Sequence, residues 1–350
     1  MRLEVRAERT YTVKVHCDWL TELAPYLRDR SRVAVVASQS ICTQVRALLP
    51  KNLGVSLLEI PDGEEGKSLL TLEALWNSFA KAGLTRNDLI VAIGGGATTD
   101  VVGFAASTWL RGLDWIAVPT TLAGMVDASV GGKTGMNSSA GKNLIGAFHS
   151  PIEVLADLSW LQTLSDRDFS AGLAEVIKCG FISDPDILTL VTSNSLADLR
   201  GSDDVTTQLI ARSVKVKSDV VSADFKESFA REILNYGHTL GHAIELHSGF
   251  TLRHGEAVAI GMVYVAELSA SRGLISKELV GQHRRILQSY GLPTTYKKSA
   301  WPQLLASMAL DKKARGSAIR FVALTGIGST TRLEDLNEDE LLGAYERISV

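Results

Sequence analysis

The sequence predicts an α/β N-terminal domain with a parallel sheet, followed by a mostly α-helical C-terminal domain. Three observations predict this arrangement. The length of 350 residues exceeds what one hydrophobic core usually supports. Short apolar runs alternate with amphipathic segments in the first half, and long helical patterns replace them in the second. We therefore expect domains at residues 1–165 and 166–350, with no proline-rich linker or internal repeat between them.

The sequence predicts three strands and one helix in the first domain. Continuous apolar runs, typical of buried parallel strands, cover Val33–Ala37, Asp88–Ile93 and Trp115–Pro119. Apolar residues at helical spacing cover residues 68–82. Strand, helix and strand in alternation predict a Rossmann-like parallel sheet with helices on its faces, a fold that commonly binds nucleotides.

The second domain is predicted to be helical, with one short strand pattern late in the chain, at Ile319–Leu324. The predicted helices span Ala171–Ile182, Val205–Ser222, Arg231–His247, Glu256–Gly273 and Lys277–Tyr290.

Composition and charge exclude several classes of protein. The chain has 36 basic and 39 acidic side chains, so its net charge of −3 does not suit a protein built for nucleic acid or an anionic membrane. Apolar stretches such as Ala257–Ala266 fall short of the ~20 residues of a membrane span, and the N-terminus lacks the apolar core of a signal peptide. Cys17, Cys42 and Cys179 form no CxxC pair, so we expect no disulfide framework and a cytoplasmic protein.

Two segments of the first domain suit an anionic ligand at the end of a strand. Gly94-Gly95-Gly96 follows a predicted strand, where backbone N–H groups and a helix N-terminus can approach a phosphate. We favour phosphate or pyrophosphate binding there over a purely structural turn. Thr120 and Thr121 end the next strand, and they suit a ligand and a hydroxyl-capped turn equally well.

A segment rich in glycine and small polar residues spans residues 126–143. We expect a long loop without a core of its own, and such loops are more often functional than not. Lys133 and Lys142 each follow a glycine, so an anionic substrate is the natural partner of their ammonium groups. The alternative is a pair of solvated surface lysines.

Four of the seven histidines cluster late in the chain, namely His238, His242, His247 and His254. On one predicted helix, Arg231, Asn235, His238 and His242 recur at spacings of four, three and four and would share a face. A histidine pair at i and i+4 is a familiar metal-binding geometry, completed by a remote carboxylate or a third histidine. Spacing alone therefore names His238 and His242 as ligands, with His254 placed to close the site.

Two further charged positions bear on this site. Glu175 and Lys178 lie one helical turn apart, so that one can ligate a metal while the other meets substrate. Lys217 lies in the run SVKVKSDVV, and on pattern alone we interpret it as a lysine on a helix surface.

These segments, in this order, resemble the 3-dehydroquinate synthase family of the sugar-phosphate cyclase superfamily over nearly the whole chain. The most specific motifs are VDASVGGKTG, GKNLIGAF, GLAEVIK, NYGHTLGHAIE and HGEAV. The resemblance implies a lyase that converts DAHP (3-deoxy-D-arabino-heptulosonate 7-phosphate) to 3-dehydroquinate and phosphate in the shikimate pathway. It implies catalytic use of NAD, one divalent metal (zinc or cobalt), and a homodimer acting on a small molecule, with neither nucleic acid nor membrane as partner.

The resemblance also implies the roles of individual residues. The metal ligands would be Glu175, His238 and His254, and His242 would face the substrate phosphate instead. The other phosphate contacts would be Lys133, Asn143, Asn235 and a lysine of the DKK motif, for which we favour Lys312 while Lys313 remains the alternative. Lys217 and Arg231 would bind the carboxylate, and Arg111 would serve a neighbouring active site. Asp127, Lys178 and Glu227 would surround the substrate hydroxyls. The positions along NAD would be Glu64, Lys67, Gly95, Gly96, Asp100, Thr120, Thr121, Asp127, Lys133, Lys142, Thr163 and Leu164.

Two departures and three alternatives accompany this resemblance. Ser38-Gln39-Ser40 stands where the family has an acidic residue or asparagine, and Asp224-Phe225-Lys226-Glu227 lacks one of the family's glutamates. The alternatives are another branch of the sugar-phosphate cyclases, a metal-dependent alcohol dehydrogenase, and a cyclase-like protein kept only for binding. The retained Arg231, Asn235 and His242 favour the dehydroquinate branch.

Overall fold

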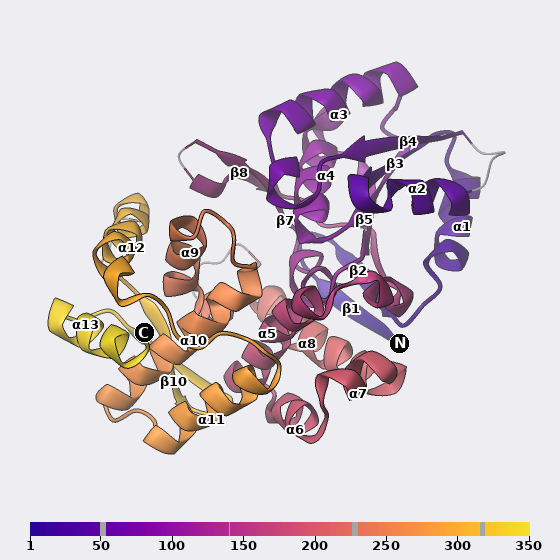
Figure 1. Cartoon of the computed structure of the whole chain (residues 1–350). Helices are drawn as coiled ribbons and strands as arrows, with labels where there is room; N and C mark the ends of the chain where they lie inside the picture. Colours follow the sequence, from indigo (N-terminus) through magenta and orange to yellow (C-terminus); the bar gives the residue numbers. More distant parts are fainter. Residues whose placement is uncertain (50–53, 140, 226–229, 316–318) are drawn as a thin grey trace. The chain divides into compact units, whose positions relative to one another are not determined.

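The computed structural model describes residues 1–49, 54–139, 141–225, 230–315 and 319–350, with the backbone alone at 230 and 310–315. The chain folds into two compact units (Figure 1). The first unit comprises Met1–Thr163 and Lys217–Lys226, and the second unit comprises Leu164–Val216 and Glu227–Val350.

A seven-stranded sheet forms the core of the first unit, in the order β1-β2-β9-β6-β5-β3-β4. All neighbouring pairs are parallel except β1 with β2. The strands are β1 (Arg2–Arg6), β2 (Thr10–Val15), β3 (Val33–Ser38), β4 (Val55–Ile60), β5 (Leu89–Gly94), β6 (Asp114–Pro119) and β9 (Glu153–Ala156). The predicted parallel sheet is confirmed, and the three predicted strands are its central members. β3 and β5 are buried along their whole length, which explains their continuous apolar runs.

Helices accompany the sheet in the first unit, and α4 packs on β5 and β6 (Figure 1). The helices are α1 (Trp19–Asp29), α2 (Gln39–Leu48), α3 (Leu69–Ala82) and α4 (Gly96–Thr108). Short helical turns are η1 (Gly63–Gly66), η2 (Trp109–Arg111), η3 (Gly124–Ala128) and η4 (Leu158–Thr163).

The strand order reverses direction between β3 and β5. From β3 the chain continues to β4 on one side, whereas β5 lies on the other side and leads on to β6. The carboxyl ends of β3, β5 and β6 therefore meet at one edge beside a topological switch point, where ligands of open α/β sheets usually bind.

The segment that we expected to be a long loop is an antiparallel hairpin. Strand β7 (Lys133–Ser138) pairs with β8 (Gly141–Phe148), with Gly135 opposite Gly146. A Cβ atom on Gly146 would lie 2.2 Å from the carbonyl oxygen of Thr134, so the glycines let the two backbones approach closely. The loop prediction was wrong because glycine content that usually marks a loop here permits close pairing, and β7 gains burial by packing on α4.

The second unit is mostly helical. Its helices are α5 (Asp166–Ile182), α6 (Pro185–Ser193), α7 (Leu196–Gly201), α8 (Asp203–Ala223), α9 (His238–His247), α10 (His254–Ser271), α11 (Lys277–Ser289), α12 (Trp301–Arg315) and α13 (Glu338–Arg347). It also holds η5 (Ala230–Asn235), η6 (Lys298–Ala300) and a hairpin of β10 (Phe321–Gly326) and β11 (Ser329–Leu333). The end of α8 belongs to the first unit, where Ser218 Oγ donates to the carbonyl of Glu4 at 3.0 Å. Within the described ranges, no helix is long and apolar enough to cross a membrane.

Helix α10 is the centre of the second unit. It packs on α5, α9, α11 and α13, and nearly all its side chains are buried (Figure 1). A helix that is apolar all round is expected in such a position.

The helix predicted over Arg231–His247 is broken in two. Gly237 has a φ of 79° and separates η5 from α9. A Cβ atom at Gly237 would lie 2.7 Å from Met262 Cγ on α10, so only glycine fits this turn. The prediction that Arg231 and Asn235 share a helix face with His238 and His242 was therefore wrong.

Candidate active site

Three side chains from three helices of the second unit converge on one point. They are Glu175 on α5, His238 at the start of α9, and His254 at the start of α10. Their ligand atoms lie within 4.8 Å of one another, and Glu175 Oε1 lies 3.5 Å from His238 Nε2 and 3.3 Å from His254 Nε2. In a tetrahedral zinc site with bonds of about 2.1 Å, ligand atoms stand about 3.4 Å apart. The observed spacing fits one divalent metal ion.

The environment of Glu175 also fits a metal ligand. The residue is 1% exposed, and both of its carboxylate oxygens are buried. Lys178 Nζ lies 2.5 Å from Oε2 and supplies one compensating charge. Burial alone would raise the pKa of Glu175, but the Lys178 ammonium and the contact with His254 outweigh it and hold that pKa well below its usual range. A buried, ionised carboxylate of this kind suits metal coordination.

Each of the two imidazoles turns Nε2 toward Glu175 and Nδ1 toward another oxygen atom. His238 Nδ1 lies 3.1 Å from the carbonyl oxygen of Tyr236, and His254 Nδ1 lies 3.1 Å from Glu245 Oε2. Since a carbonyl oxygen can only accept, the His238 proton lies on Nδ1 and the lone pair on Nε2. Burial lowers the pKa of His238 and favours this neutral form. Burial also disfavours a charged His254, but the carboxylates of Glu175 and Glu245 outweigh it and raise that pKa.

His242 occupies a different position from the one that spacing indicates. It is exposed, one turn after His238, and the two ring centroids are 5.3 Å apart. It falls in a second group with Glu245 and His254, whose ligand atoms also lie within 4.8 Å of one another. In the described part of the chain, no such group holds both His238 and His242. The geometry favours Glu175 over His242 as the partner of His238 and His254.

Glycines allow the three helices to approach this closely. Gly255 directly follows His254, and a Cβ atom there would lie 1.8 Å from the carbonyl oxygen of Ala171 on α5. A Cβ atom at Gly261 would lie 1.9 Å from the carbonyl oxygen of Gly237, before α9. Reasoning from the sequence missed these positions, although Gly255 stands inside the HGEAV motif.

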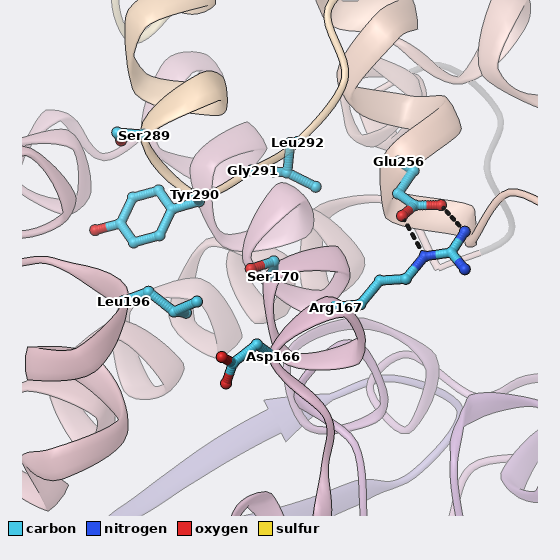
Figure 2. Close-up of a pocket in the computed structure, with 9 residues that line it drawn as sticks. All are labelled: Asp166, Arg167, Ser170, Leu196, Glu256, Ser289, Tyr290, Gly291 and Leu292. Carbon is cyan, nitrogen blue, oxygen red and sulfur yellow. Dashed lines mark hydrogen bonds and ion pairs between the residues drawn. The ribbon is translucent and has the colours of Figure 1, made fainter.

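A cavity of about 280 Å³ lies beside the start of α10 (Figure 2). Its lining consists of Asp166, Arg167, Ser170, Leu196, Glu256, Ser289, Tyr290, Gly291 and Leu292, and it includes none of the predicted site residues. Figure 2 shows Arg167 paired with Glu256 through two contacts, of 2.6 and 2.8 Å. Glu256 Oε2 also accepts from the backbone N–H of Arg253 at 2.8 Å. This pair holds the first turn of α10, which carries His254.

The remaining predicted residues of the second unit lie on η5 and α12. Arg231 is buried at 2% exposure and Asn235 is half-buried, both on η5. Glu227 lies outside the described residues, and so does the side chain of Lys312, whose backbone belongs to α12.

Lys217 is buried in the first unit, so its interpretation as a surface lysine was wrong. Its Nζ donates to the carbonyl oxygen of Asp127 and lies 2.6 Å from Asp127 Oδ1. Helix periodicity could not show this, because the end of α8 lies against the first unit rather than in solvent.

Several residues predicted to bind NAD or phosphate form one polar cluster in the first unit. Lys67 is buried, with Nζ 2.6 Å from Asp100 Oδ2 and 2.5 Å from Asn143 Oδ1. Burial raises the pKa of Asp100, and the Lys67 ammonium opposes that rise. Glu64 Oε1 lies 3.3 Å from Lys142 Nζ. The cluster brings together η1, the start of α4 and the β7–β8 hairpin.

The glycine turn and the threonine pair lie next to each other at the carboxyl edge of the sheet. A Cβ atom at Gly95 would lie 3.2 Å from Thr121 Cγ2, and one at Gly96 would lie 2.8 Å from Ala128 Cβ. Thr120 is buried and donates its N–H to the carbonyl of Gly94 at 2.9 Å. Glycine at these positions therefore allows the turn to pack closely on the segment after β6.

Four predicted residues lie elsewhere. Lys133 is exposed at the start of β7, and Arg111 is exposed with a φ of 67° at the end of η2. Thr163 ends η4, where its Oγ1 donates to the carbonyl of Trp160 at 2.6 Å, and Leu164 begins the second unit.

A carboxylate does lie near the end of β3, although the sequence directly after that strand has none. Asp62 Oδ1 accepts from Ser40 Oγ at 2.7 Å, and Asp62 Oδ2 accepts from the Ser40 N–H at 3.1 Å. Asp62 therefore stands beside the position where the family carries an acidic residue or asparagine.

Solved structures that share this fold point to one class of enzyme. A 2-deoxy-scyllo-inosose synthase, complexed with carbaglucose-6-phosphate, NAD⁺ and Co²⁺, is 26% identical with a TM-score of 0.88 over 99% of both chains. A 2-epi-5-epi-valiolone synthase from Streptomyces hygroscopicus subsp. jinggangensis, with NAD⁺ and Zn²⁺ bound, is 26% identical with a TM-score of 0.89 over 99% of both chains. A sulfoacetaldehyde reductase from Bifidobacterium kashiwanohense shares the fold alone, at 14% identity and a TM-score of 0.69 over 97% of both chains. Fold and site together define a protein of the sugar-phosphate cyclase class.

Family models and curated relatives narrow the class. The 3-dehydroquinate synthase N-terminal model matches residues 57–171, and the C-terminal model matches residues 172–314. A 3-dehydroquinate synthase from Corynebacterium diphtheriae is 48% identical over 99% of this chain and 98% of its own length. One from Streptomyces avermitilis is 47% identical over 97% of this chain and 94% of its own length. The chain belongs to the 3-dehydroquinate synthase family and is a phosphate-eliminating lyase of the shikimate pathway. The resemblance drawn from the motifs is confirmed.

Proposed function

We propose that this chain converts DAHP to 3-dehydroquinate and phosphate with NAD and one zinc or cobalt ion, which Glu175, His238 and His254 hold. The observation that carries this proposal is the convergence of those three side chains, whose ligand atoms lie within 4.8 Å of one another around the buried carboxylate of Glu175. The NAD⁺ and Co²⁺ or Zn²⁺ in the two similar cyclase structures support it.

When bound, the metal ion would polarise a substrate hydroxyl, and NAD would take up a hydride and later return it. The side chains of the chain itself bind and orient the substrate. Lys178, with its ammonium beside Glu175, is proposed to hold the reacting hydroxyl, together with Asp127 and Glu227. Arg231 and Lys217 are proposed to bind the substrate carboxylate, since a guanidinium fork matches a planar anion.

The proposed phosphate contacts are Lys133, Asn143, Asn235, His242 and Lys312. Fixed cationic and amide donors would stabilise the charge that develops on the departing phosphate. The phosphate dianion is itself a base next to the C–H bond that breaks, and we infer that it takes that proton as it leaves. Ring opening and aldol closure of the released enolate then require only that the same donors hold the chain ends in place.

NAD is proposed to bind at the carboxyl edge of the first unit, which makes residues 1–165 the cofactor domain and residues 166–350 the metal and substrate domain. The switch point between β3 and β5 supports this position. The proposed contacts are Glu64, Lys67, Gly95, Gly96, Asp100, Thr120, Thr121, Asp127, Lys133, Lys142, Thr163 and Leu164.

A homodimer in the cytoplasm is also proposed. Arg111 is exposed on a turn in which Leu110 and Arg111 both have positive φ, of 49° and 67°, and this conformation supports a side chain held out for a partner. Cys17, Cys42 and Cys179 are not joined by disulfides, in keeping with a reducing compartment.

The substrate is tested by assaying DAHP and sedoheptulose 7-phosphate side by side. Sedoheptulose 7-phosphate lacks the carboxylate, so it cannot make the contact proposed for Arg231 and Lys217. We expect its kcat/KM to be lower by at least about 10³-fold, since a site built to bind a polar group of its substrate strongly rejects an analogue that lacks this group. Equal turnover of the two substrates, or turnover of sedoheptulose 7-phosphate alone, would assign the chain to another cyclase branch.

A further inference from the structure

Glu245 is a buried carboxylate to which the proposed mechanism assigns no role. It lies on α9 and is 3% exposed, seven residues after His238. Seven residues make almost two helical turns, so His238 and Glu245 lie on one face of α9. A buried carboxylate is costly unless its environment compensates the charge, so its position calls for a specific partner.

That partner is His254, which lies between two carboxylates. Its Nδ1 is 3.1 Å from Glu245 Oε2, and its Nε2 is 3.3 Å from Glu175 Oε1. An ionised carboxylate only accepts hydrogen bonds, so the contact with Glu245 places a proton on Nδ1. The Nε2 atom is thereby directed at Glu175.

His238 shows the same arrangement with a different acceptor. Its Nδ1 faces the carbonyl oxygen of Tyr236 at 3.1 Å, and its Nε2 faces Glu175. Both imidazoles are thus oriented through Nδ1, one by a neutral carbonyl and the other by a charged carboxylate. Glu245 also links α9, which carries His238, to the first residue of α10.

We propose that Glu245 is a positioning residue for the metal site. By accepting the hydrogen bond from His254 Nδ1, it fixes the orientation of the ring and makes Nε2 a stronger donor to the metal. The inference rests on the proposed metal site at Glu175, His238 and His254. Glu245 also groups with His242 and His254, so direct ligation by Glu245 is the outcome that the experiment has to separate from positioning.

The experiment titrates metal-stripped full-length protein with Co²⁺ and with Zn²⁺ against a competing chelator. In Glu245→Ala the acceptor is lost, and we expect the Kd for both metals to rise by about 10–100-fold. In Glu245→Gln the amide oxygen still accepts the hydrogen bond but carries no charge, so we expect a smaller rise, of about 10-fold. The visible absorption bands of bound Co²⁺ should keep their wild-type positions in both variants, because all three ligands remain.

Two controls make the result decisive. Glu267→Gln makes the same chemical change on α10, where Glu267 pairs with Arg284 and Arg347 at 2.9 Å each, and it should leave both Kd values unchanged. Glu175→Gln removes a proposed ligand and should abolish tight binding. If Glu175→Gln binds metal normally, the proposed metal site itself is wrong.

Two results would overturn the inference while leaving the metal site intact. One is wild-type affinity in Glu245→Gln, and in Glu245→Ala if that variant folds, together with loss of binding in Glu175→Gln. The other is a Co²⁺ spectrum in Glu245→Gln that reports a lost ligand, which would make Glu245 part of the coordination sphere. The Gln variant keeps the size of the side chain, so it decides the question even if the Ala variant fails to fold.

Discussion

Three lysines among the described side chains are buried, and each lies against a carboxylate. The pairs are Lys67 with Asp100, Lys178 with Glu175, and Lys217 with Asp127. Taking an ammonium group out of water is expensive, and removing one member of a pair leaves an uncompensated buried charge. Substitutions in these pairs would therefore mix a loss of stability with a loss of function. An exposed residue of the proposed phosphate set is a cleaner probe.

Lys133 is that probe, because it is exposed at the start of β7. We expect Lys133→Ala to lower kcat by about 10²–10³-fold through loss of a fixed donor to the leaving phosphate. The measurement is phosphate release from DAHP. Lys81→Ala, at another exposed lysine on α3, is the matched control and should keep the wild-type rate. Near-normal turnover in Lys133→Ala would remove Lys133 from the phosphate set.

His283 gives a prediction about pH. It is fully buried, stacked on Phe181 with ring centroids 3.6 Å apart, and burial lowers its pKa to about 4. Its Nδ1 contacts the carbonyl of Leu279 at 2.7 Å, so Nε2 is the acceptor for Tyr236 Oη at 2.8 Å. Since the folded pKa lies below the unfolded value of about 6.5, the unfolded chain binds the extra proton between these two values. The stability that neutral His283 contributes is complete above pH 6.5 and is lost as the pH falls toward 4.

The measurement is urea unfolding at pH 7 and at pH 5. Between pH 7 and pH 5, the wild-type protein should lose about 2 kcal/mol of unfolding free energy through His283, since each unit of pKa difference corresponds to about 1.4 kcal/mol. His283→Gln should lack that part of the loss, whereas His16→Asn, at an exposed histidine with positive φ, should behave as wild type. An equal loss in wild type and His283→Gln would show that His283 is not the group responsible.

At the scale of elements, the contact of α10 with α5 sets the position of His254, a proposed metal ligand, relative to Glu175. Gly255 is the point of closest approach, since a Cβ atom there would lie 1.8 Å from the carbonyl oxygen of Ala171. We expect Gly255→Ala to push α10 away from α5 and to move His254 from Glu175. Overpacking of this kind costs about 1–3 kcal/mol of stability, and metal affinity should fall as well.

Thermal unfolding and Co²⁺ titration of Gly255→Ala test this prediction. Gly201→Ala, on α7, is the matched control because nothing lies within 4 Å of a Cβ atom there. It should match the wild type in both measurements. Unchanged metal affinity in Gly255→Ala would show that the approach of α10 to α5 does not position His254.

Central strands of the sheet and several long helices could be predicted from the sequence, because their burial produces continuous or periodic apolar patterns. β3 and β5 are buried on both faces, so their apolar runs are continuous, and α3 was legible from its helical period. The hairpin β7–β8 could not be predicted in this way. Its pairing depends on glycines that allow the two backbones to approach closely. Glycines add nothing to the periodic pattern of apolar side chains by which a strand is predicted.

The break at Gly237 shows a second limit. Hydrophobic period and histidine spacing continue through this residue, but its backbone adopts a φ of 79° because Met262 leaves no room for a side chain. The geometry does not favour His238 and His242 as a pair of ligands, because spacing along one helix cannot show Glu175 and His254 approaching from two other helices. Glu245 was in the quoted motif NYGHTLGHAIE, but only the fold brings it to His254.

At the scale of the whole molecule, each unit holds its own part of the proposed chemistry. The proposed metal ligands all come from the second unit, and the glycine turn, threonine pair and polar cluster all come from the first. Two relatives that are 47–48% identical over nearly their whole length are both 3-dehydroquinate synthases, the family to which this chain belongs.

The proposed homodimer is tested by mixing two inactive variants. We expect Arg111→Ala and His254→Ala each to be strongly impaired alone. If Arg111 serves the neighbouring site, a mixed dimer has one site that carries both residues, and a randomly reassorted 1:1 mixture should recover about a quarter of wild-type activity. Recovery should appear only after the subunits exchange. An Arg111→Ala variant with normal activity, or a mixture that recovers none, would contradict this role.

The most direct test of the proposed reaction measures phosphate release from DAHP before and after metal removal. NAD⁺ is present at far below the substrate concentration. We expect many phosphates released per NAD⁺, 3-dehydroquinate as the product and no accumulation of NADH. A chelator should abolish turnover, and added Zn²⁺ or Co²⁺ should restore it. Turnover that survives complete removal of the metal would contradict the proposed role of the metal ion. NADH that accumulates in step with the product would contradict the catalytic use of NAD.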